Sequence, residues 1–173
     1  MLNKDEIQQY EEPLLDHTQM LRVTGVPRER HHLWTKRGLG RVHPGRGHAR
    51  EYSIGEVLYF AYVKLLLEAG VLLDDAGFLA GGLFPEFGGQ VLFEVADLLR
   101  SSDRPDACPR VLAVVWKSAG GWRQALVNKT ELENPEITAP VPAGSLWAIV
   151  VDLTAVVNQT MNGARLILKS RKK

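Results

Sequence analysis

The chain has one cysteine, Cys108, in 173 residues, so it can form neither an intrachain disulfide framework nor a cysteine-rich zinc site. It has no apolar run near the roughly 18 residues that a membrane-spanning helix needs. Residues 1–13 are polar and acidic, which is not the pattern of a secretory signal peptide. We therefore expect a cytoplasmic protein with no membrane partner.

Catalytic motifs are equally scarce. The sequence has no Gly-rich phosphate loop, nucleophile–base pair or paired-carboxylate motif. His31 and His32 are adjacent, and neighbouring side chains on a helix point about 100° apart, so they cannot easily share one ion. Asp152 lies where a strand gives way to a helix and is expected to cap that helix. We expect no enzymatic activity, no cofactor and no bound metal.

What the chain does have is charge that is unevenly distributed. Its net charge is only +1, yet residues 21–50 carry eight Lys or Arg against one acid, a net of +7, with four of the five histidines. Residues 1–20 have a net charge of −4 and residues 51–100 a net charge of −6. A basic block between acidic segments is typical of a local contact with a polyanion. The alternative is a solvated charged face.

The pattern of helix-start residues predicts two short helices in the basic block. Asp16 and Gln19 have the spacing of a capping box, which predicts a helix over 17–23. Gly25 favours the left-handed geometry of a tight turn, and a second helix is predicted over 27–37. Two short helices joined by a Gly-containing turn are typical of a helix-turn-helix.

Residues 41–52 are predicted to form a basic hairpin, which projects as a wing and is anchored in the core by Tyr52. Ser53 and Glu56 form a second capping box, which predicts a helix over 54–69. That helix is apolar nearly all round, so something must cover its outer face. The C-terminal half of the chain or a second subunit is expected to do so.

The remaining elements are predicted from periodicity and turn residues. In chain order they are a helix over 73–79, an amphipathic helix over 86–100, a polar linker over 101–109, strands over 110–116, 122–128 and 146–151, and a closing helix that Thr154 can cap and that ends near Leu168. Three tryptophans in this half, Trp116, Trp122 and Trp147, allow a small-molecule pocket, although packing of the sheet explains them better.

Four short motifs occur in order in the first half: Thr24-Gly25-Val26, Gly38-Leu39, Arg50-Glu51-Tyr52-Ser53 and Glu68-Ala69-Gly70-Val71. They resemble the T-G-V, I-G-L, Y-R-x-Y-S and E-L-G-[FV] motifs in the DNA-binding domain of the MerR family of transcription regulators. The resemblance covers about residues 16–80 and implies a winged helix-turn-helix. His32, Leu33 and Trp34 stand where the family often has Arg-Tyr-Tyr.

Together these observations predict an α+β protein. Residues 14–83 form the MerR-like winged helix-turn-helix and residues 84–101 a connecting helix. Residues 102–173 form a small three-stranded antiparallel sheet with a closing helix, used for dimerisation or for binding a ligand or partner. The expected function is sequence-specific binding of double-stranded DNA by a homodimeric, nucleoid-associated transcription regulator from a bacterium or phage, with a small molecule or protein as effector.

Two alternatives stay open at this stage. One keeps the fold and makes the protein a phage or plasmid accessory factor for excision, packaging or partition. The other is a protein-interaction module that docks through the apolar helix 54–69.

The candidate DNA contacts are the cationic and polar side chains of the second helix and the wing. They are Arg28, Arg30, His31, His32, Thr35, Lys36, Arg37, Arg41, His43, Arg46, His48 and Arg50. Helical spacing predicts one exposed stripe made of Arg28, the two histidines and Thr35, with Arg28 deepest in the major groove. The arginines of the wing are expected at the neighbouring minor groove or its phosphates. Protonation of the four histidines near pH 6.5 should strengthen binding.

Overall fold

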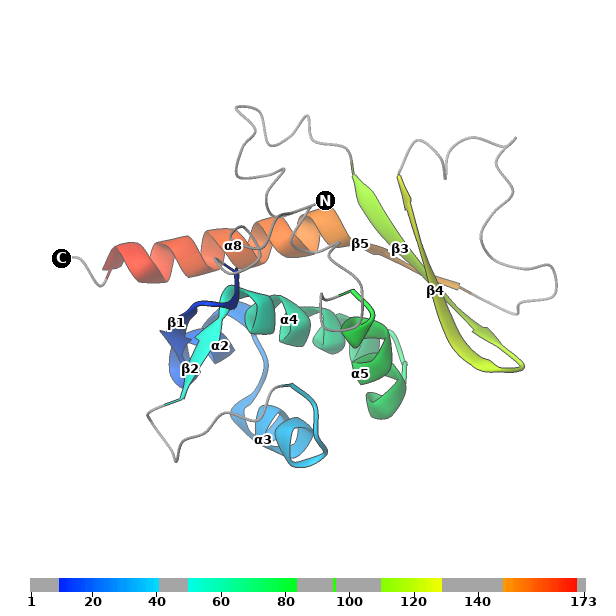
Figure 1. Ribbon diagram of the computed structural model, residues 1–173, viewed down its shortest axis with the longest axis horizontal. Coiled ribbons are helices and arrows are strands. Elements are labelled where there is room, and N and C mark those ends of the chain that lie inside the picture. Colours follow the sequence, from blue (N-terminus) through cyan, green and yellow to red (C-terminus); the bar gives the residue numbers. More distant parts are fainter. Residues whose placement is uncertain (1–9, 41–49, 84–94, 96–109, 129–147, 171–173) are drawn as a thin grey trace.

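The computed structural model describes residues 10–40, 50–83, 95, 110–128 and 148–170 (Figure 1). Within them, helices pack with one two-stranded and one three-stranded antiparallel sheet, which confirms the predicted α+β class. None of the helices in these residues combines the length and the apolar character that crossing a membrane requires.

The two predicted helices of the basic block are present as α2 (His17–Thr24) and α3 (Arg28–Lys36). The capping box is confirmed, because the Gln19 N–H donates to Asp16 Oδ1 over 2.9 Å and the Asp16 N–H donates to Gln19 Oε1 over 3.0 Å. Gly25 ends α2 with a φ of 64°, a left-handed conformation that glycine adopts without steric cost.

A strand that the sequence analysis missed precedes α2. It is β1 (Pro13–Asp16), which pairs antiparallel with β2 (Glu51–Ser53), so that Leu15 lies opposite Tyr52. Residues 51 and 52 were expected to pair within their own hairpin; in the described residues their partner is β1 instead. The reason is burial, since Leu15 and Tyr52 are both enclosed in the core. The rest of the predicted wing, residues 41–49, lies outside the described residues.

Helix α4 (Ile54–Glu68) is the centre of the fold. It begins with the predicted capping box: the Glu56 N–H donates to Ser53 Oγ over 3.2 Å, and the Ser53 N–H donates to Glu56 Oε2 over 2.9 Å. Its apolar side chains are buried on several faces. The expected cover comes from the C-terminal half, because α8 (Leu153–Ser170) runs along α4 in the opposite direction and also contacts α2 (Figure 1).

The C-terminal half forms the predicted three-stranded antiparallel sheet. Its order is β4 (Gly121–Asn128), β3 (Val111–Ser118) and β5 (Ala148–Asp152), with the hairpin turn at Ala119 and Gly120. It lies at one end of α4, next to α5 (Leu73–Gly81), the helix that was predicted over 73–79 (Figure 1).

The start of α8 resolves two competing predictions. Asp152 is its N-cap, because Asp152 Oδ1 accepts a hydrogen bond of 2.9 Å from the Ala155 N–H. The prediction that Thr154 caps the helix is wrong. Thr154 Oγ1 instead accepts a hydrogen bond of 2.9 Å from the Val111 N–H, which ties the first turn of α8 to β3.

Polar contacts also join the sheet to the helices. Gln124 on β4 donates from Nε2 to the Leu79 carbonyl over 2.8 Å, and the Tyr62 hydroxyl donates to Gln124 Oε1 over 3.4 Å. One hydrophobic cluster runs through α4, α5, α8 and the sheet. Of the predicted helix 86–100 and linker 101–109, only Val95 is described, and it is helical and buried in that cluster.

Candidate nucleic-acid interface

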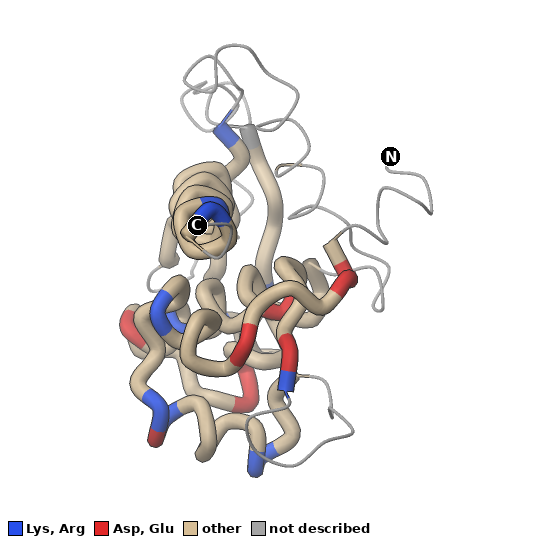
Figure 2. The backbone as a smooth tube through the Cα atoms, turned by 90° about the vertical axis from the view of Figure 1, so that its left-hand side faces the viewer, with Lys and Arg blue, Asp and Glu red and all other residues tan. Residues whose placement is uncertain are grey.

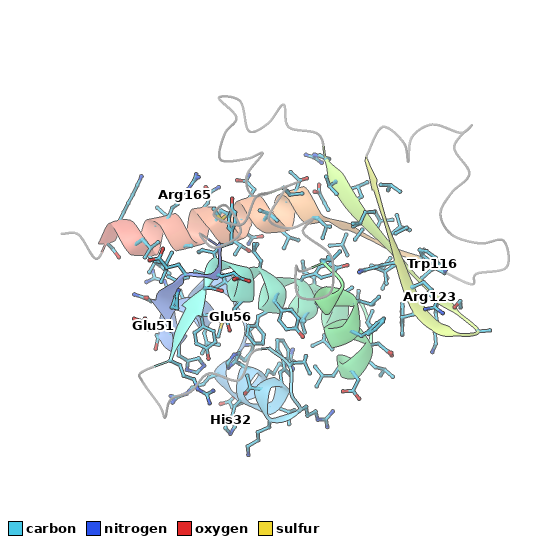
Figure 3. The ribbon with its side chains drawn as sticks, in the orientation of Figure 1. His32, Glu51, Glu56, Trp116, Arg123 and Arg165 are labelled. Carbon is cyan, nitrogen blue, oxygen red and sulfur yellow. The ribbon has the colours of Figure 1, made fainter. Side chains whose placement is uncertain are left out.

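Helix α3 lies at the end of the molecule opposite α8, with its lysine and arginine positions at that end of the backbone (Figures 1 and 2). Four of the candidate contacts on this helix and its C-cap are basic and solvent-exposed: Arg28, Arg30, Lys36 and Arg37. One acid, Glu29, offsets them, so this short segment carries a net charge of +3. His32 is also exposed and points away from the helical body (Figure 3).

Two side chains fasten α3 to the core, and one of them corrects a prediction. Trp34 is buried as expected, and its ring stacks near Phe60. His31 is only 2% exposed, so placing it on an exposed DNA-binding stripe was wrong. A helix of nine residues needs an inward face at i, i+3 spacing, and His31 with Trp34 supplies it. The single tryptophan of this helix could have indicated which face was inward.

The environment of His31 is an aromatic cluster. Its Nδ1 lies 3.1 Å from His17 Nε2, so α2 and α3 are linked by a pair of imidazoles. The ring of His31 makes T-shaped contacts with two other rings. The ring centroids are 4.7 Å apart for Phe60 and 5.7 Å apart for Tyr52. The cluster therefore holds α3 against α4 and β2, and fixes the orientation of its outer face.

Thr35 is half-buried rather than fully exposed. Its hydroxyl lies 3.1 Å from the carbonyls of both His31 and His32, and donates back into its own helix. The hydroxyl proton is therefore used within α3, and Thr35 has only its oxygen lone pairs to offer a ligand.

Arg50, the residue before β2 and the last arginine of the predicted wing, acts on the same region. Arg50 is half-buried. Burial raises the pKa of Tyr52, and the nearby charge of Arg50 opposes that rise. Arg28 and Arg50 both act electrostatically on His17, so the start of α3 and the residue before β2 both lie within electrostatic reach of that imidazole. The other wing candidates, Arg41, His43, Arg46 and His48, lie outside the described residues.

Burial is the main reason that the pKa of His17 lies below its ordinary value of 6.5, and the nearby charges of Arg28 and Arg50 lower it further. The carboxylate of Asp16 opposes this shift, and His32 adds to it. The folded state therefore favours the neutral form of the His17 imidazole.

This shift predicts a loss of stability in acid. Between the lowered pKa of His17 and about 6.5, the unfolded chain binds more protons than the folded one, so stability rises with pH across that window and this contribution is constant above it. We expect His17→Gln to flatten the dependence of the melting temperature on pH between 5 and 7. His32→Gln, at an exposed position, is the control; His32 is the last of the named causes of the shift, so this variant should keep nearly all of the slope of the unmodified protein. Equal slopes in both variants would contradict the prediction.

In the C-terminal half, the two described tryptophans pack within the sheet. Trp122 is buried in the main cluster, whereas Trp116 lies on the other face of the sheet, opposite Arg123 on the neighbouring strand (Figure 3). Packing in the main cluster therefore accounts for Trp122, whereas Trp116 is buried outside that cluster. Trp147 lies outside the described residues.

Comparison with known proteins adds no assignment: neither a family model nor a curated protein matches this chain. Within the part of the chain that the structure describes, no three His, Cys, Asp or Glu side chains gather as metal ligands would.

Two exposed side chains of α3 were absent from the predicted contacts. Glu29 carries the opposite charge to its neighbours, and Leu33 is apolar yet 48% exposed. The candidate contacts were predicted from positive charge and hydrogen-bonding groups in a basic block, and neither an acid nor a leucine fits that pattern. Because His31 and Trp34 are buried on the opposite face, Glu29 and Leu33 lie on the outer face of α3.

Proposed function

We propose that this protein binds double-stranded DNA sequence-specifically and regulates transcription, as a cytoplasmic homodimer whose residues 14–83 act as a MerR-like winged helix-turn-helix. The observation that carries the proposal is the exposed basic face of α3, held on a rigid aromatic base at one end of the molecule. An α-helix fits the major groove of B-DNA, and cations on its flanks can contact phosphates on both sides.

The anchoring of α3 to the core supports this function. Base recognition requires donors and acceptors held in fixed positions, and side chains on a mobile helix would lose affinity through the entropy of ordering. The contact between His31 and His17 and the burial of Trp34 fix α3 before any ligand arrives. Arg28, at the first turn, and Arg50, just before β2, both lie within electrostatic reach of His17, so two cations come to this region from different segments.

Gel shifts at graded salt test the proposal. Each phosphate contact changes the slope of log affinity against log salt by about 0.9, so Arg28→Ala and Arg46→Ala should each weaken binding and flatten the slope by about one contact. Arg165→Ala, on the exposed side of α8, is the matched control and should change neither. Affinity that does not depend on salt, or that is the same in all three variants, would refute DNA binding at this face.

The alternatives differ in what they require. A docking module needs an open apolar face on α4, but α8 covers that helix and packs along it in the described residues. A phage or plasmid accessory factor would use the same face of α3, and is distinguished by where its binding sites lie in the genome: at promoters, or at attachment, packaging or partition sequences.

A further inference from the structure

The direction in which each side chain of α3 points follows from its two anchors. Successive residues of an α-helix are rotated by about 100° about its axis. The outward direction of α3 is the one opposite to the mean direction of His31 and Trp34, and Glu29 and Lys36 point within roughly 10° of it. His32 and Leu33 lie roughly 50° to either side of that direction. All four side chains are exposed, which agrees with this geometry.

The arginines occupy the flanks of this outer face. Arg28 lies on the side of His32, and Arg30 and Arg37 lie on the side of Leu33, each about 90° to 110° from the outward direction. If α3 enters a groove, the flanks face the two sugar-phosphate walls and the outer face meets the base edges. The residues nearest the bases are then not the arginines.

We infer that Glu29 and Leu33 are specificity-determining residues that contact base edges in the major groove, an inference that rests on the proposed DNA-binding function. A carboxylate and an aliphatic side chain on the outer face of a cationic helix add nothing to the attraction between the helix and phosphate. Each is chemically suited to one kind of base edge.

Glu29 is suited to cytosine. A carboxylate accepts hydrogen bonds only, and the cytosine N4 amino group is a donor in the major groove that Glu is known to read. Against guanine O6 and N7 or thymine O4 the carboxylate meets acceptors and is repelled. Glu29 therefore selects by exclusion as well as by attraction, because an unpaired buried carboxylate beside phosphates is strongly unfavourable.

Leu33 is suited to the 5-methyl group of thymine, the one apolar feature of the major-groove edge. It lies four residues after Glu29, about 6 Å further along the helix axis. That distance is near two base-pair steps of about 3.4 Å each. We expect the recognised half-site to contain a cytosine and a thymine about two base pairs apart.

The experiment is selection of bound duplexes from a random pool by the full-length protein and its variants. The unmodified protein should select cytosine at one position, and Glu29→Gln should change that preference toward adenine by about tenfold, since Gln pairs with adenine N6 and N7. Replacing the selected thymine by deoxyuridine removes only the methyl group, and should weaken the unmodified protein a few-fold but leave Leu33→Ala unaffected.

Matched controls separate base reading from general effects. Glu68→Gln and Leu166→Ala make the same chemical changes at exposed positions of α4 and α8, and should leave the selected sequence unchanged. If Glu29→Gln or Leu33→Ala weakens all sequences equally, or selects the original site unaltered, the inference is overturned while DNA binding stands. If the unmodified protein selects no sequence, the proposed function itself fails.

Discussion

Replacing Val157 by aspartate should unfold much of the protein, although this residue is far along the chain from the proposed DNA-binding face. Val157 is on α8, is 0% exposed, and belongs to the cluster that joins α8 to the helices of the first half. Burying an unpaired carboxylate there costs about 4 kcal/mol or more, out of a typical total stability of about 5–15 kcal/mol. We expect the melting temperature to fall by about 10 °C or more.

Because of this packing, the proposed DNA binding should depend on the C-terminal helix. The affinity of Val157→Asp for DNA should fall together with its folded fraction, because α3 is held by Phe60 on α4 and α4 is covered by α8. Leu166→Asp introduces the same group on the same helix at a position that is 71% exposed, and should melt with the unmodified protein. Equal melting temperatures for the two variants would show that α8 does not stabilise the first half.

Much of the fold could be predicted from sequence because its helix starts are encoded locally. Both capping boxes, at Asp16 and at Ser53, use residues only three apart, so they need no knowledge of tertiary structure. The all-round apolar helix 54–69 also correctly predicted that a distant element must cover it. Local composition did not say which element, and the contact with α8 appears only in three dimensions.

The errors have a common physical cause, which is that pairing partners lie far apart in sequence. Strand β1 has four residues and is stabilised by β2, some 35 positions later, so no local pattern marks it. His31 is polar by type, yet it is buried because His17, Tyr52 and Phe60 surround it. Sequence reasoning therefore identified the helix that carries the candidate site but assigned one inward residue to its outer face, and left out Glu29 and Leu33.

Reversing two charges on one flank of α3 should nearly abolish the proposed binding of DNA. Arg30 and Arg37 are exposed and lie on the same flank of α3, so the double variant Arg30→Glu, Arg37→Glu should fold normally while it replaces the two attractive phosphate contacts proposed there by two repulsive ones. Two lost contacts alone reduce the salt slope by about 1.8. Together with the repulsion, we expect affinity near 0.1 M salt to fall by about a hundredfold or more.

A second double variant shows whether position or total charge matters. Arg165→Glu, Lys169→Glu makes the same change of net charge on exposed residues of α8, at the end of the molecule away from α3 (Figure 3). Long-range attraction is largely screened beyond the Debye length of about 10 Å at 0.1 M salt, so this variant should lose only a few-fold in affinity and keep its salt slope. An equal loss in both variants would mean that DNA responds to the charge of the whole molecule, and would remove α3 as the contact surface.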